Sequence, residues 1–187
     1  MPLPCPELLP GEGFTLRRHR PADREAFADF LTDPEATRHM AFTAEQRTAQ
    51  GARSMLDHVI SAYGSDHEVL SLTIADAADD SYLGSVGGTA TGTDGVVEIY
   101  YTVMPTAQGR GLATGAVRLL LAYLFSLDGV TSVRADVTAG NRPSVRVLEK
   151  LGFRDTGPVE RTAEGGELAH DALTGRRYVR DADAAEG

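Results

Sequence analysis

The fold of this chain is decided by the stretch Gln108-Gly109-Arg110-Gly111-Leu112-Ala113. It lies between a strand-like run at 96–103 and a long, apolar, helix-like run at 114–125. A glycine turn that enters a helix leaves backbone N–H groups unpaired, and the helix dipole adds partial positive charge there. Gly109 and Gly111 let the backbone approach a ligand, and Arg110 adds a full charge. The stretch predicts either a pyrophosphate cradle or an ordinary strand-to-helix turn that contains glycines.

Two well-known phosphate motifs do not fit this turn. A dinucleotide fingerprint needs G-x-G-x-x-G, but the third position here is Thr114, and Gly115 comes one residue late. A Walker loop needs Gly-Lys followed by Ser or Thr, and the turn contains no lysine. A dinucleotide-dependent oxidoreductase is therefore a weak alternative.

The pattern Gln108-x-x-Gly111-x-Ala113 resembles the Arg/Gln-x-x-Gly-x-Gly/Ala signature of the GNAT superfamily, the acetyl-CoA-dependent N-acyltransferases. A second segment resembles an element of the branch that contains ribosomal-protein N-terminal acetyltransferases, and it reads Asn141-Arg-Pro-Ser144-Val-Arg-Val-Leu148-Glu-Lys-Leu-Gly152-Phe153. The two elements have the order and separation of that family, and the resemblance covers about 14–153. It implies an α/β fold of the α+β type, with a mixed, mostly antiparallel sheet of six or seven strands flanked by helices.

Length and composition favour one globular domain, since the chain has 187 residues and an ordinary apolar content of 42%. We expect a loose N-terminal arm at 1–13, a single domain at 14–180 and a mobile tail at 181–187. The lone Cys5 excludes an internal disulfide and fits a reducing compartment. Neither a signal peptide nor a membrane-spanning run is recognised, so we expect a cytoplasmic protein.

The charge distribution bears on the partners. The net charge of −9 disfavours nucleic acid, which binds mainly through Lys and Arg. Between Gln108 and Lys150, however, six positive and three negative side chains give a local balance of +3. This suits an anionic cofactor on that segment and a cationic partner elsewhere, although scattered solvated charge is the alternative. We expect an amine substrate, either a peptide N-terminus or a small molecule, and a monomer or homodimer without membrane contact.

Apolar periodicity predicts the order of the elements. Helices are expected at 21–31, at 43 or 44 to 62, at 114–127 and at 142–151. Strands are expected at 14–17, 68–75, 82–91, 96–103 and 131–137, with a closing hairpin of 153–156 and 177–180 and turns at Gly165-Gly166 and Thr174-Gly175. Gly115 inside a helix costs roughly 1 kcal/mol relative to Ala, and the related branch commonly has Glu at that position.

The resemblance implies an acetyl-CoA site. In this family the strand at 96–103 parts from its neighbour, so that backbone near its end can bind the pantetheine arm as an added strand. One N–H there can polarise the thioester carbonyl. The cofactor-binding candidates are Val103, Met104, Gln108, Gly109, Arg110, Gly111, Leu112, Ala113, Thr114, Asn141 and Arg146.

The acceptor amine needs a pocket and a base. The family's early helical pair forms one wall of that pocket, so His39 and Phe42 are candidate substrate contacts, with a packed inter-helix loop as the alternative. Strand alternation puts Glu98, Tyr100 and Thr102 on one face. We expect Tyr100 to contact substrate and Glu98 to act as the base, because a carboxylate in a central strand is costly without a function or a partner. A structural Glu bonded to neighbouring backbone is the alternative.

The departing thiolate needs a proton. Many relatives have a tyrosine four residues after the Ser144 position, but this chain has Leu148 there. Ser144 is therefore the candidate acid, with helix capping or cofactor contact as its alternative role and Tyr100 and Tyr101 as further candidates. The five histidines lack zinc-site spacing, so no metal is expected.

These patterns together predict an enzyme, an acetyl-CoA-dependent N-acetyltransferase. It would move an acetyl group to a primary amine by direct attack, because no nucleophile suited to a covalent intermediate is placed by the pattern. A non-catalytic acyl-CoA-binding or regulatory domain of the same fold is the alternative.

Overall fold

The computed structural model describes residues 3–40, 42–161 and 173–182. Eight described strands form one sheet in the order β1-β2-β3-β4-β5-β6-β8-β7. Their bounds are β1 Leu8–Pro10, β2 Phe14–Arg18, β3 Leu70–Asp76, β4 Tyr82–Ala90, β5 Val96–Val103, β6 Ser132–Thr138, β7 Arg154–Arg161 and β8 Leu173–Asp181. Every neighbouring pair is antiparallel except β5 and β6, which are parallel. The mixed, mostly antiparallel sheet flanked by helices is confirmed.

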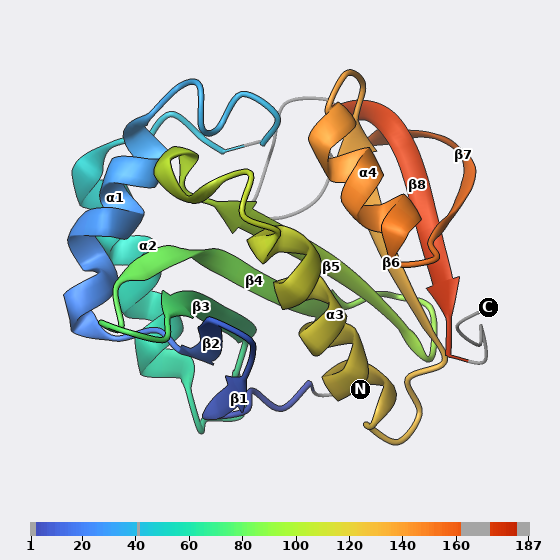
Figure 1. The fold of residues 1–187 in the computed structure, drawn as a ribbon, viewed down its shortest axis with the longest axis horizontal. Coiled ribbons are helices and arrows are strands. Elements are labelled where there is room, and N and C mark those ends of the chain that lie inside the picture. Colours follow the sequence, from blue (N-terminus) through green and yellow to red (C-terminus); the bar gives the residue numbers. More distant parts are fainter. Residues whose placement is uncertain (1–2, 41, 162–172, 183–187) are drawn as a thin grey trace.

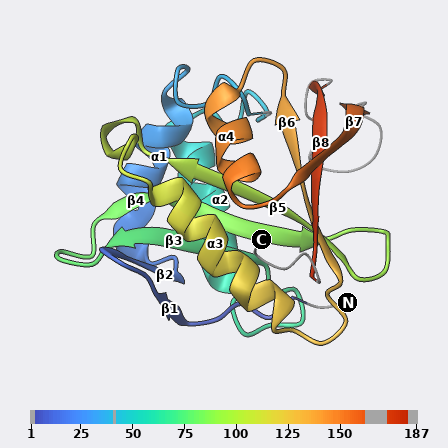
Figure 2. The same cartoon turned by 45° about the vertical axis from the view of Figure 1, so that its right-hand side comes forward.

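Helices cover both faces of this sheet (Figures 1 and 2). The elements α1 (Arg24–Thr32) and α2 (Ala49–Ala62) lie on one face, and α3 (Leu112–Phe125) and α4 (Arg142–Lys150) lie on the other. Two short 3-10 turns, η1 (Pro21–Asp23) and η2 (Pro105–Ala107), precede α1 and the glycine turn. The larger core cluster fills the α3 side of the sheet, and a smaller one joins α1 to α2.

The N-terminal segment differs from expectation. It was expected to be a loose arm and the sheet to have six or seven strands, but β1 pairs with β2 and brings the described strands to eight. Leu3 and Cys5 are buried in the main core, so apolar burial holds down a segment whose prolines indicated a loose arm. At the other end Asp181 still pairs in β8, and Thr174-Gly175, expected to be a turn, also pair within that strand. Residues 183–187 and the expected turn at Gly165-Gly166 lie outside the described residues.

The second helix begins later than its sequence signal indicated. Thr43 and Gln46 bond reciprocally, each side chain accepting from the other's backbone N–H, which closes a turn rather than a helix. The helix itself begins after Thr48, whose hydroxyl oxygen accepts from Gly51 N–H at 3.0 Å. The chain therefore carries two successive capping signals, and only the second begins α2.

Close packing accounts for the glycine inside α3. A Cβ atom on Gly115 would lie 2.9 Å from Cε1 of Phe14, whose ring is buried under the helix. A larger side chain would displace that ring from the core. The helix-propensity cost of Gly115 is thus offset by the packing of β2 against α3.

A buried polar cluster lies between β2, β3 and η1. The Arg17 guanidinium donates to both Asp23 oxygens at 2.8 and 3.0 Å, and Thr73 donates to Asp23 at 2.9 Å. Although burial opposes it, these bonds lower the pKa of Asp23. Burial also lowers the pKa of His19 from 6.5 to about 4, against the attraction of Asp23. His19 is therefore neutral near pH 7 and bonds Ser71 and Thr73 through its two ring nitrogens.

This buried imidazole should make stability depend on pH. Between pH 6.5 and about 4 the unfolded chain binds a proton at His19 that the folded chain does not. The free energy of unfolding should therefore fall as the pH falls through that window, by about 3 kcal/mol in total. Urea unfolding at pH 7.0 and 4.5 measures this loss. His19→Gln should abolish most of it, and His58→Gln, at an exposed histidine, should keep it. An equal loss in both variants would assign the effect to other groups.

Candidate functional site

The strands β5 and β6 pair over only three residues each. Val96–Glu98 lie beside Ser132–Arg134, and the two strands then separate while β6 continues along β8 (Figure 1). The carboxyl-terminal half of β5 therefore has a neighbour, β4, on one edge only. The sequence resemblance implied this parting of the strands.

A groove of about 510 Å³ opens at the end of β5, between the glycine turn and α4. From the turn and α3 it is lined by Gln108, Gly109, Gly111, Leu112, Ala113 and Thr114. From α4 and its N-cap it is lined by Asn141, Pro143, Ser144, Arg146, Val147 and Lys150. With the exception of Arg110 and Met104, the predicted cofactor-binding residues line this groove.

The glycine turn presents backbone N–H groups to the groove. Gly109 and Gly111 have φ values of +77° and +79°, a left-handed conformation that a side chain would strain. The first bond of α3 runs from Gly115 N–H to the Gly111 carbonyl, so the preceding N–H groups of the first turn have no partner within the helix. A Cβ atom on either turn glycine would meet no atom within 4 Å. Both glycines therefore have free space beside them where they line the groove.

The positive side chains that line the groove are not all the ones expected from the sequence. Arg110 does not line the groove; it is half exposed and lies 3.6 Å from the Asp76 carboxylate. The positive side chains that line the groove are Arg146 and Lys150, both from α4, together with Arg38. Gln108 has a structural contact, because its Nε2 donates to the Val103 carbonyl at 3.2 Å.

The backbone at the end of β5 points in two directions. Met104 N–H donates to the Leu83 carbonyl at 2.8 Å, so that group is used within the sheet. Because ladder bonds alternate along an antiparallel strand, the N–H groups of Tyr101 and Val103 point the other way, into the gap beside β6. Of the two predicted backbone sites, Val103 therefore faces the gap, and Met104 does not.

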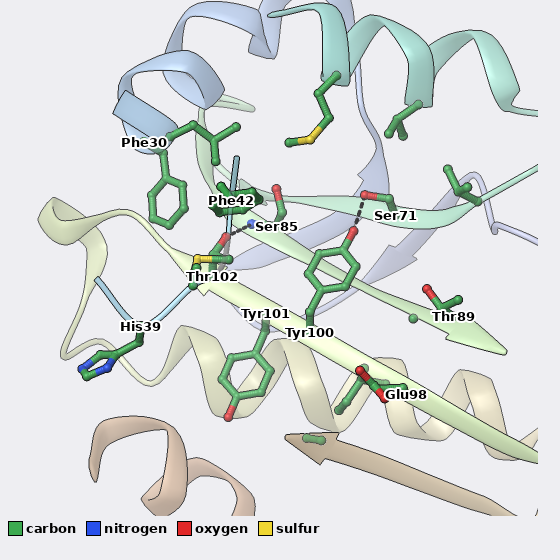
Figure 3. A pocket seen from close by; sticks show the side chains of 18 of the residues that line it. Phe30, His39, Phe42, Ser71, Ser85, Thr89, Glu98, Tyr100, Tyr101 and Thr102 are labelled. Carbon is green, nitrogen blue, oxygen red and sulfur yellow. Dashed lines mark hydrogen bonds between the residues drawn. The ribbon is translucent and has the colours of Figure 1, made fainter. Parts of the chain in front are cut away.

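A second cavity of about 470 Å³ lies on the α1–α2 side of the sheet (Figure 3). Much of its wall is apolar, including Phe27, Phe30, Leu31, Met40, Phe42, Met55, Leu56, Val59, Val69 and Leu70. Polar side chains come mainly from the sheet and include Ser71, Ser85, Glu98, Tyr100, Thr102 and Asp136. The two cavities share Phe30, His39, Met40, Tyr101, Thr102, Asn141 and Ser144, so they meet beside the parted strands.

Glu98 lies on the cavity side of β5, as strand alternation predicted. Its neighbours Val97 and Ile99 are buried in the core under α3. The Glu98 side chain is about one-fifth exposed, and Arg134 bonds its Oε2 at 2.9 and 2.8 Å. Asp136, on the cavity wall, is bonded by Arg177 at 2.8 Å through both oxygens. The cavity thus has two carboxylates, each oriented by an arginine.

Ser144 lies at the start of α4 and contacts a tyrosine from β5. Its hydroxyl is 2.6 Å from the Tyr101 hydroxyl, while Asn141 caps the helix by accepting from Ser144 N–H at 3.3 Å. The capping role that sequence left open for Ser144 therefore belongs to Asn141. Burial raises the pKa of Tyr101 to about 12. Leu148 is fully buried, and the phenol beside Ser144 comes from β5, another part of the chain.

His39 lies where the two cavities meet. Its Nδ1 is 3.1 Å from Thr138 Oγ1, and Arg38 Nε donates to its Nε2 at 3.2 Å. Burial, and then the Arg38 charge, lower the pKa of His39, which favours a neutral ring. The predicted contacts His39, Phe42 and Tyr100 all line the cavity.

Neither a metal centre nor a membrane span is found in the part of the chain that the structure describes. Within 3–40, 42–161 and 173–182, no three His, Cys, Asp or Glu side chains gather as metal ligands would. No described helix has the length and apolarity needed to cross a bilayer. Cys5 is buried, and burial raises the pKa of its thiol to about 11, which disfavours a nucleophilic role.

Known proteins share this sequence pattern and fold. The family model described as "Acetyltransferase (GNAT) domain" matches residues 14–154. An "Uncharacterized N-acetyltransferase p20" from Bacillus licheniformis is 28% identical over 152 residues, covering 81% of this chain and 84% of that protein.

Two solved structures have the same fold at low identity. RimJ from Mycobacterium smegmatis, in complex with CoA-disulfide, has a TM-score of 0.74 at 20% identity and covers 93% of this chain and 84% of its own. The ribosomal-protein-S5-alanine acetyltransferase from Vibrio fischeri has a TM-score of 0.71 at 15% identity, covering 96% and 99%. The eight-stranded sheet, its parted strands and the family match lead to one conclusion: this chain belongs to the GNAT acetyltransferase family.

Proposed function

We propose that this protein transfers the acetyl group of acetyl-CoA to a primary amine by direct attack. The observation that carries the proposal is the meeting of two cavities beside the parted strands. One cavity has a helix N-terminus and cations, and the other has carboxylates and an apolar wall. Donor and acceptor can therefore approach from opposite sides of β5. Family membership supports acyl transfer, and the finer chemistry rests on the site.

The hydrogen-bond donors and positive charges around the groove suit acetyl-CoA. The N–H groups at the start of α3 suit the pyrophosphate, and Arg146 and Lys150 lie on the opposite wall. The N–H groups of Tyr101 and Val103 suit the amide arm, which would bind as an added strand. The complex of the Mycobacterium smegmatis protein with CoA-disulfide supports this assignment. When bound, the cofactor supplies an activated acetyl thioester.

The cavity has the chemistry to receive an amine. The carboxylates of Glu98 and Asp136 attract an ammonium, and Glu98 is the proposed base that accepts its proton. The proposed acid is Ser144, which gives its hydroxyl proton to the leaving sulfur. As the serine proton leaves, the Tyr101 hydroxyl, 2.6 Å away, passes its own proton to the serine oxygen, and the phenolate then regains a proton from solvent.

The cavity wall narrows the class of acceptor. Because much of the wall is apolar, we propose a primary amine on an apolar body, either a peptide N-terminus or a small molecule. The Vibrio fischeri protein of the same fold is described as acting on ribosomal-protein-S5-alanine, which supports a peptide acceptor.

The activity can be tested in two steps. Acetyl-CoA and CoA should raise the melting temperature, and NAD should not, because the turn lacks a dinucleotide fingerprint. Thiol release with a panel of amines and short peptides then measures transfer. Tight CoA binding without release for any acceptor would instead support the alternative, a non-catalytic acyl-CoA-binding domain.

The glycine turn offers a matched test of cofactor binding. Gly111→Ala should raise the Kd for CoA about tenfold or more, since a methyl group would enter the groove at a left-handed residue. Gly64→Ala is the control, because Gly64 has φ +75° and equally open surroundings but does not line the groove. Both variants should lose similar stability, and only the first should lose affinity in calorimetry. Equal affinities would place the phosphates elsewhere.

The proposed base and acid can be separated from cofactor binding. Glu98→Gln and Ser144→Ala should each lower kcat by about 10² or more with an unchanged Kd for CoA. Glu149→Gln, at an exposed position on α4, is the control and should keep wild-type kcat. Steady-state thiol release with titration calorimetry measures both quantities. Parallel loss of kcat and affinity would indicate that the residue is structural.

A further inference from the structure

A continuous chain of hydrogen bonds runs from the acceptor cavity into the protein. Tyr100 Oη donates to Ser71 Oγ at 2.5 Å (Figure 3), and Ser71 Oγ is 2.9 Å from His19 Nε2. His19 Nδ1 is 2.7 Å from Thr73 Oγ1, which donates to Asp23 at 2.9 Å. Apart from Tyr100, every member is buried.

The chain of hydrogen bonds begins with three residues that lie side by side on β5, β4 and β3. Tyr100 lies directly opposite Gly87 of β4, and Gly87 lies directly opposite Ser71 of β3. A Cβ atom on Gly87 would be 2.6 Å from the Tyr100 oxygen. The glycine therefore lets the phenol lie over β4 and bond a serine two strands away.

Asp23, at the far end of this chain of hydrogen bonds, determines which group donates in each of them. The Asp23 carboxylate, held ionised by Arg17, can only accept. Thr73 has one hydroxyl hydrogen and donates it to Asp23, so Thr73 must accept from His19 Nδ1–H. The neutral His19 ring then has a lone pair on Nε2.

The same rule applies to the next member. Ser71 has one hydrogen and must donate it to Nε2, so its oxygen accepts from Tyr100. The Tyr100 hydroxyl hydrogen is therefore used in the bond to Ser71. Toward the cavity the Tyr100 oxygen can only accept a hydrogen bond.

We propose that Ser71, His19, Thr73 and Asp23 are positioning residues that fix Tyr100 as a hydrogen-bond acceptor for the N–H of the acceptor amine. This inference rests on the proposed transfer to an amine. An amine that donates one N–H to Tyr100 keeps its lone pair for the thioester carbon, so the contact selects a donor group and orients it. The chain does not carry the proton away, because an imidazole with a pKa of about 4 is too weak a base for an ammonium.

The donor and acceptor directions in this chain of hydrogen bonds can be measured without substrate. Nitrogen-15 NMR of the imidazole should find the Nδ1–H tautomer of His19 in the wild type. In Thr73→Val the Nδ1–H would lose its acceptor, so the ring should change to the Nε2–H tautomer and donate to Ser71. Ser71 would then donate its hydrogen to Tyr100, and the Tyr100 hydrogen would turn toward the cavity. An Nε2–H tautomer in the wild type overturns the inference, whether or not the enzyme turns over.

Binding of 2-phenylethylamine in the presence of CoA tests the consequence. Tyr100→Phe and Thr73→Val should each raise its Kd about tenfold, while Thr73→Ser, which keeps the hydroxyl, should restore wild-type affinity. The double variant Thr73→Val/Tyr100→Phe should be no worse than Tyr100→Phe, because both changes remove the same acceptor. The Kd for CoA should stay constant throughout.

Three outcomes separate this inference from the proposed function. Wild-type amine affinity in Tyr100→Phe, or additive losses in the double variant, would overturn the inference while leaving acetyl transfer intact. The Tyr100→Phe variant also keeps the test valid if Thr73→Val fails to fold. Failure of every amine to release thiol would overturn the proposed function, and the tautomer measurement would still decide the polarity of the chain.

Discussion

The early separation of β5 from β6 is the constraint on which the site depends. A central strand normally has both edges paired, but here three residue pairs suffice before the strands diverge. The unpaired edge of β5 would be costly in a closed sheet, since buried N–H and C=O groups need partners. The gap is flanked by the first turn of α4, whose Ser144 contacts Tyr101 of β5. One irregularity in the sheet thereby creates a backbone binding edge and a junction between two cavities.

Strand β5 serves both sides of that junction. Val97 and Ile99 pack into the core under α3, while Glu98, Tyr100 and Thr102 line the acceptor cavity. Burial raises the pKa of the Tyr100 phenol to about 12, as it does that of Tyr101. The two adjacent tyrosines nevertheless differ in partner, because Tyr100 bonds Ser71 of β3 and Tyr101 bonds Ser144 of α4.

The buried polar cluster behind Tyr100 bears on both the stability of the fold and the orientation of Tyr100. An ion pair as buried as Arg17 with Asp23 adds little net stability, because desolvation offsets much of the Coulomb attraction. Its partners suggest a second use, since an ionised carboxylate at one end orders the hydrogens of a neutral histidine and two hydroxyls. A purely apolar core at this place could not orient a phenol.

The sequence by itself determined the family, the glycine turn and the order of the elements from β2 onward, because these depend on residues close together along the chain. Alternation in β5 was likewise enough to put Glu98 and Tyr100 on one face. Only the tertiary structure decided that Arg110 pairs with Asp76, that Asn141 caps α4, and that Tyr101 reaches Ser144. The alignment of Tyr100, Gly87 and Ser71 on three strands could not be predicted from the sequence either. Strand register brings together residues that are far apart along the chain. Local patterns specify elements and faces, whereas partners across strands exist only once the sheet has assembled.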